Sequence, residues 1–89
     1  MNAQPTQINL LNHHAAKRLR QLRERLALSR PKFADQLGIP PTTLKNYELG
    51  YREIGGGLFL LMAQHPELKQ HTDWLLTGQA PATTVQEEA

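Results

Sequence analysis

The chain has 89 residues, a formal net charge of +2, no cysteine and four histidines. This length allows one domain with a modest core. The lack of cysteine excludes a disulfide framework and a thiolate metal site, and no apolar run approaches the roughly 18 residues of a membrane helix. We therefore expect a small cytoplasmic protein with no membrane segment and no signal peptide.

The charge is unevenly distributed along the chain. Residues 17–52 hold nine lysines and arginines against three acids, which leaves this segment at +6. Residues 53–89 hold one lysine against five acids and stand at −4. A basic half beside an acidic half indicates one surface for a polyanion and another for a different partner, although solvated helix surfaces give the same pattern.

The N-terminal part predicts an arm followed by a long helix. Residues 1–12 are polar and are expected to form a flexible arm. Asn12 is the candidate N-cap of a helix over residues 13–28. Apolar residues recur there at intervals of three and four, which is the spacing of one helical face. They are Ala15, Ala16, Leu19, Leu22 and Leu26.

Two short helices joined by a tight turn follow. Ser29 is the expected N-cap of a helix over residues 30–37, and Gly38 is expected to end it in a left-handed conformation. Pro41, a residue favoured at the first helical position, opens a third helix over residues 41–48. Such a pair is a helix-turn-helix, the arrangement that places a rigid helix in the major groove of DNA.

A fourth helix is expected over residues 57–65, after a loop over residues 51–57. The run Gly55–Gly57 belongs to that loop, because three glycines cost backbone entropy inside a helix. The core residues expected from the apolar periodicity of the whole chain are Leu28, Phe33, Leu37, Ile39, Leu44, Leu58 and Leu61.

The last predicted element is one helical turn in the segment TDWLL. Thr72 is its expected N-cap and Gly78 its stop. Residues 79–89 are polar and are expected to form a disordered tail. The predicted organisation is therefore an arm, one domain over residues 13–78, and this tail.

Four segments carry a resemblance to a known family. They are LRQLRERLALS (19–29), FADQLGI (33–39), TLKNYELG (43–50) and DWLLTG (73–78). In this order and spacing they resemble the lambda-repressor-like, XRE-type helix-turn-helix family of phage and bacterial repressors. The resemblance covers about residues 14–78. It implies an all-α, compact five-helix DNA-binding domain whose second and third helices form the helix-turn-helix.

The resemblance also implies a structural ion pair and a set of DNA contacts. Arg23 and Glu48 occupy positions at which family members pair an arginine with a glutamate, so we expect them to lock the first helix to the third. The outward positions of the third helix read base edges, where asparagine suits adenine and lysine suits guanine. The expected base contacts come from Pro41, Thr42, Lys45 and Asn46.

Phosphate contacts are expected on both sides of that helix. Arg30 stands where the family commonly has glutamine, which strengthens the charge at this position. The expected phosphate contacts come from Arg30, Lys32, Thr43, Tyr51 and Arg52. Two alternatives stay open: Thr42 can cap its helix, and Lys32 and Arg52 can be ordinary solvated charges.

The four histidines do not predict a metal site. His13 and His14 are adjacent and point to different helix faces, while His65 and His71 have no further ligand at a suitable spacing. The run Gly55–Gly57 lacks the Lys–Ser/Thr of a P-loop, and no nucleophile–base pattern is present. We expect no metal, no cofactor and no enzymatic activity.

The expected function is sequence-specific binding of double-stranded DNA by a transcriptional regulator, a repressor of the phage or prophage type. A homodimer on a palindromic operator would double a small interface. Its surface is expected within residues 58–78, at Leu61, Trp74 and Leu75, with capping of the monomer core as the other role open to Trp74. The alternative function is an antitoxin that binds DNA and a toxin protein.

Overall fold

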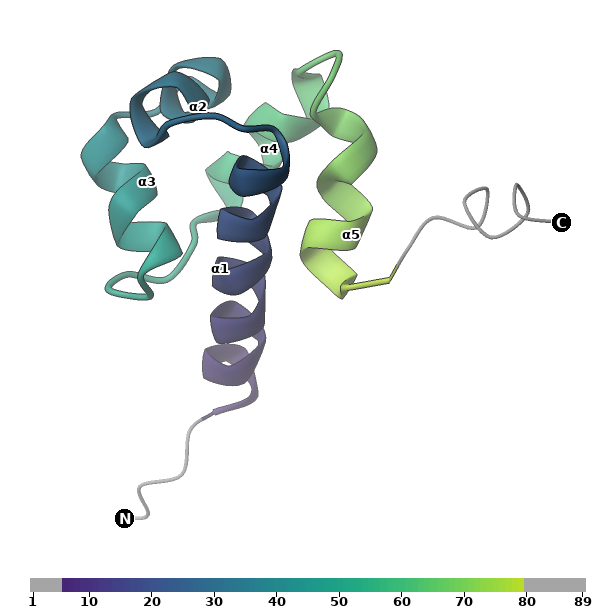
Figure 1. Ribbon diagram of the computed structural model, residues 1–89. Coiled ribbons are helices and arrows are strands. Elements are labelled where there is room, and N and C mark those ends of the chain that lie inside the picture. Colours follow the sequence, from purple (N-terminus) through teal and green to yellow (C-terminus); the bar gives the residue numbers. More distant parts are fainter. Residues whose placement is uncertain (1–5, 80–89) are drawn as a thin grey trace, which may run out of the picture.

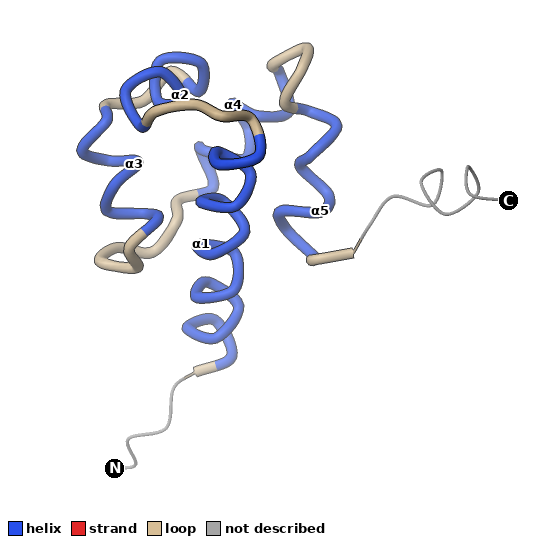
Figure 2. Tube along the Cα trace, viewed as in Figure 1, coloured by secondary structure: helices blue, strands red, loops and turns tan. Residues whose placement is uncertain are grey.

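Five α-helices and one 3-10 helix form the part of the chain that the computed structural model describes, residues 6–79 (Figures 1 and 2). No strand occurs in this part, and the expected all-α, lambda-repressor-like class is confirmed. The predicted tail lies outside the described residues except for Gln79. The elements are α1 (Gln7–Arg25), α2 (Arg30–Leu37), α3 (Pro41–Glu48), α4 (Gly56–Gln64), the 3-10 helix η1 (Lys69–His71) and α5 (Thr72–Thr77).

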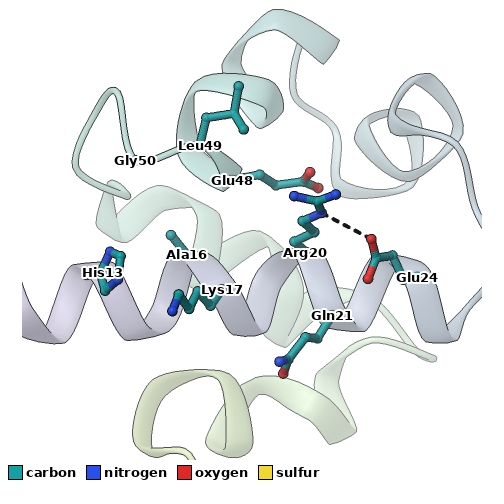
Figure 3. A pocket seen from close by; sticks show the side chains of 9 residues that line it. All are labelled: His13, Ala16, Lys17, Arg20, Gln21, Glu24, Glu48, Leu49 and Gly50. Atoms are coloured by element: carbon teal, nitrogen blue, oxygen red, sulfur yellow. Dashed lines mark hydrogen bonds and ion pairs between the residues drawn. The ribbon is translucent and has the colours of Figure 1, made fainter.

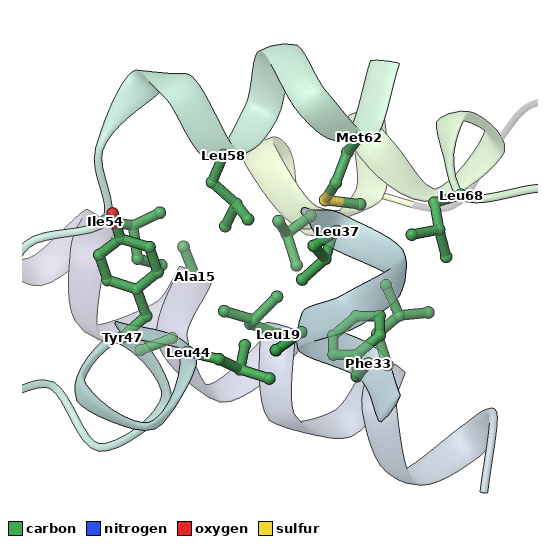
Figure 4. Packing of buried hydrophobic residues seen from close by; sticks show 14 residues of the cluster. Ala15, Leu19, Phe33, Leu37, Leu44, Tyr47, Ile54, Leu58, Met62 and Leu68 are labelled. Carbon is green, nitrogen blue, oxygen red and sulfur yellow. The ribbon is translucent and has the colours of Figure 1, made fainter. Parts of the chain in front are cut away.

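α1 lies at the centre of the molecule, with α3 and α5 on opposite sides of it (Figure 1). α2 crosses above its C-terminal end. The buried side chains of these helices meet in one core, in which Leu19, Phe33 and Leu44 are fully buried (Figure 4). None of the helices in residues 6–79 is long and apolar enough to cross a membrane.

The predicted start of the first helix is wrong. α1 begins at Gln7 because the hydroxyl of Thr6 caps it, accepting a hydrogen bond from the Asn9 amide at 3.0 Å. Residues 7–12 are therefore helical and not part of an arm. Asn12 is not a cap; its side-chain oxygen accepts a hydrogen bond of 2.8 Å from the Ile54 amide and ties α1 to the loop before α4.

α1 also ends three residues earlier than predicted, at Arg25. Ala27 follows with a φ of 58°, in the left-handed region. The helix-turn-helix itself agrees with the prediction at every boundary. The hydroxyl of Ser29 accepts a hydrogen bond of 3.3 Å from the Lys32 amide, and Gly38 ends α2 at a φ of 82°.

α4 corrects two expectations. Its first residue is Gly56, one residue before the predicted start at 57, so only Gly55 of the glycine run lies outside the helix, as its N-cap. Leu58 and Met62, four residues apart, face the core, whereas Leu61 is 41% exposed and is not the core residue predicted. Two further predicted core residues, Leu28 and Ile39, are only partly buried.

α5 continues directly from η1. Thr72 is its first helical residue and not its N-cap. The Thr72 amide donates a hydrogen bond to the Lys69 carbonyl, and its side-chain hydroxyl has no hydrogen-bond partner within residues 6–79. Gly78 ends α5 at a φ of 80°, as predicted. Arg18 of α1 donates a hydrogen bond of 2.9 Å from Nε to the Leu75 carbonyl, which fixes the end of α5 against α1.

Candidate nucleic-acid interface

The outer face of α3 presents the predicted base-contacting side chains. Pro41, Thr42 and Lys45 are exposed, and Asn46 is half-buried at the edge of this face. No side chain of residues 6–79 caps α3, so the capping role open to Thr42 is not observed. The structure therefore groups all four residues on one helix, and their contacts with bases stay a prediction.

The first turn of α3 offers free backbone donors beside these side chains. Pro40 is the N-cap and Pro41 the first helical residue, and neither has an N–H group. The amides of Thr42 and Thr43 come next and have no intrahelical acceptor. Because they point out of the positive end of the helix dipole, they suit an anion such as a phosphate.

A buried carboxylate fixes the orientation of α3. The side chain of Glu48 has no exposed surface, and it accepts hydrogen bonds from Arg23 Nε at 2.8 Å and from Arg23 Nη2 at 3.2 Å. The predicted ion pair is thus present and bidentate. It connects the middle helix α1 to the last turn of α3, and such a fork–fork pair restricts the angle between them.

The carboxylate of Glu48 also holds a second arginine. Arg30 at the start of α2 donates from Nε to Glu48 Oε1 at 2.9 Å, with 31% of its side chain exposed. The sequence interpretation gave Arg30 only a phosphate contact and missed this ion pair. The terminal nitrogens of Arg30 have no hydrogen-bond partner within residues 6–79, so this guanidinium can still donate outward.

The predicted phosphate-contacting residues beyond α3 are accessible. Lys32 on α2 is exposed, and Tyr51 after α3 is 73% exposed. Arg52 is exposed and its guanidinium carbon lies 5.5 Å from the centre of the Tyr47 ring, a cation–π contact that restrains it. Their placement on both sides of α3 agrees with the predicted groove contacts without testing them.

The three residues predicted at the dimer interface differ in burial. Leu75 is fully buried in the core of its own chain, so it offers no surface to a second copy. Trp74 is partly buried against that core and lies under the guanidinium of Arg25, 4.7 Å from the ring centre. Leu61 is exposed. Sequence periodicity could not separate these cases, because a turn and the 3-10 helix η1 interrupt the helical period between Gln64 and α5.

Two histidines have structural roles that the sequence did not reveal. His65 Nδ1 accepts hydrogen bonds from the amides of Glu67 and Leu68 at 3.1 and 3.2 Å, which organises the turn after α4. Burial lowers the pKa of His71 from 6.5, and the nearby positive charge of Arg25 lowers it further. Both effects keep His71 neutral inside the fold.

Comparison with known proteins identifies the family of this chain. A family model described as helix-turn-helix matches residues 19–69, more than half of the chain. The chain belongs to this helix-turn-helix family, of the lambda-repressor-like, XRE type. It is accordingly a DNA-binding transcriptional regulator. Comparisons with curated proteins and with solved structures gave no match.

Proposed function

We propose that the chain is a sequence-specific repressor of the phage or prophage type that inserts α3 into the major groove of double-stranded DNA. The observation that supports this most directly is the exposed face of α3, held at its C-terminal end by the buried carboxylate of Glu48. A reading helix must keep its angle while it binds, and two guanidinium groups on one carboxylate provide that rigidity.

The contacts divide into two groups. Asn46 and Lys45 can donate hydrogen bonds to purine edges, and Thr42 and Pro41 offer apolar contact to a thymine methyl. Phosphates are held by the exposed cations and by the first amides of α3. The proposed phosphate-contacting residues are Arg30, Lys32, Thr43, Tyr51 and Arg52.

Selection of bound fragments from random duplexes, followed by footprinting, tests this function. The expected result is one recurring half-site with protected flanking phosphates. Asn46→Ala should reduce discrimination at one base by about 5-fold to 150-fold, the range of about 1–3 kcal/mol per good base contact. Gln70→Ala, which truncates an exposed amide side chain on η1 away from α3, is the matched control and should bind as the parent does. Equal loss on all sequences would refute base reading by Asn46.

We further propose that two copies bind a palindromic operator through α4 and α5. Exposed leucines lie on these helices: Leu60 is 69% exposed, Leu61 41% and Leu76 48%. A surface of this kind on a small domain favours self-association. Leu61→Glu should produce a monomer in sedimentation equilibrium and remove the two-fold symmetry of the footprint. A parent chain that is monomeric on and off DNA would contradict the dimer.

An antitoxin function is the second candidate. Residues 53–89 carry the acidic excess of −4, which suits a basic protein partner while α3 binds DNA. A small toxin-like gene beside this one, and a stable complex of the two purified products, would favour this function over a phage-type repressor.

A further inference from the structure

A pocket of about 440 Å³ lies between α1 and the end of α3 (Figure 3). One side is a row of α1 side chains at helical spacing, His13, Lys17 and Arg20. The other side is formed by Glu48, the last residue of α3, and by Leu49 and Gly50 after it. No proposed DNA contact uses this pocket or any of the three basic residues.

The pocket is continuous with the outer face of α3. Leu49, which lines it, follows Lys45 by four residues and Thr42 by seven, so all three share one helical face. Leu49 is 37% exposed. Gly50 completes the rim at a φ of 75° and has no side chain to close the opening. A ligand on the outer face of α3 therefore meets the mouth of this pocket.

The charge of the pocket favours an anion. Arg20 points toward the end of α3 and forms an exposed ion pair of 3.0 Å with Glu24 (Figure 3). The negative charge of Glu48 is matched by Arg23 and Arg30 behind it. Lys17 has no ion pair within residues 6–79, so its charge is not offset locally.

We propose that this pocket binds a phosphate of the DNA backbone, with Lys17 and Arg20 as its donors. The inference rests on the proposed function, because α3 must lie in the major groove for the strand beside it to reach the pocket. Lys17 supplies an uncompensated charge, and Arg20 exchanges its exposed partner Glu24 for the phosphate. The footprint thus extends along α1, beyond the helix-turn-helix.

The test measures the affinity of the full chain for a mixed-sequence duplex as a function of salt. Each phosphate contact contributes about 0.9 to the slope of log affinity against log salt. Lys17→Gln should make the slope shallower by about 0.9. The ratio of the parent's affinity to the variant's affinity should therefore fall about 3.5-fold between about 50 and 200 mM salt. Lys17→Arg should restore the parent slope, and Glu24→Gln should raise affinity by releasing Arg20.

Lys69→Gln is the matched control, since it removes the same charge from η1, which joins α4 to α5 away from α3. Its slope should equal that of the parent. Equal changes in Lys17→Gln and Lys69→Gln would overturn the pocket proposal alone, because Lys17 would then act only through net charge. A parent chain that fails to bind duplex DNA at low salt would overturn the proposed function and this inference together.

Discussion

Neutralising Glu48 should be among the most destabilising conservative changes in this fold. The carboxylate has no exposed surface and accepts three charge-assisted hydrogen bonds, of 2.8, 3.2 and 2.9 Å. Glu48→Gln keeps the volume but leaves Arg23, 14% exposed, without a counter-charge. Removing one partner of a buried pair costs about 3–5 kcal/mol. Because small domains are stable by only about 5–15 kcal/mol, the variant should lose a large part of its stability.

Urea unfolding followed by far-UV circular dichroism measures this loss. The matched control is Glu24→Gln, which breaks an arginine–glutamate pair of 3.0 Å that is about half exposed. Its expected cost is below about 0.5 kcal/mol. Arg30→Gln removes one of the three hydrogen bonds and should fall between the two. If Glu48→Gln and Glu24→Gln cost the same, the buried ion pair does not stabilise α3 and the reasoning fails.

Three further outcomes are expected. Ala27→Gly should raise the unfolding free energy by about 0.5–1 kcal/mol, because alanine is strained at a φ of 58°; destabilisation would contradict this. The pKa of His71 is lowered in the fold. The contribution of neutral His71 to the free energy of unfolding is therefore fully present above about pH 6.5 and is lost as the pH falls below that value. Stability should therefore drop less steeply on acidification in His71→Gln than in the exposed control His14→Gln, and identical slopes would refute this. Leu75→Ala should lower the free energy of unfolding by about 2–5 kcal/mol at any protein concentration, because Leu75 is buried in the core of its own chain. If the variant only dimerised more weakly, Leu75 would belong to a dimer interface instead.

The helix-turn-helix was predictable because its signals are local. Ser29, Gly38 and Pro41 each act within one or two turns of their own position, and the structure places every boundary where these residues put it. The start of α1 was missed because both Thr6 and Asn12 can cap a helix. The choice between them depends on the Ile54 amide, which lies 42 residues from Asn12 along the chain.

The sequence predicted which helices carry the candidate site residues, but it did not predict all of the contacts between their side chains. The exposure of Thr42 and Lys45 follows from helical periodicity. The pairing of Arg30 with Glu48 does not, because it depends on the angle at which α2 crosses α3. Leu61 was expected both in the core and at the dimer surface, and Leu75 at the dimer surface. Leu61 is exposed and Leu75 is buried, because the path from α4 to α5 is set by tertiary packing and by the turn at His65.

The contacts that hold α3 and α5 against α1 differ in how far apart their residues lie in the sequence, which affects the order of folding. Glu48 meets Arg30 and Arg23 across only 18 and 25 residues, whereas the contact from Arg18 to the Leu75 carbonyl spans 57. Short loops close fast and at a small entropy cost. During folding, α1, α2 and α3 can therefore assemble around the carboxylate of Glu48 before α5 docks. In this order α3 is oriented early, and docking of α5 completes the core as the last step.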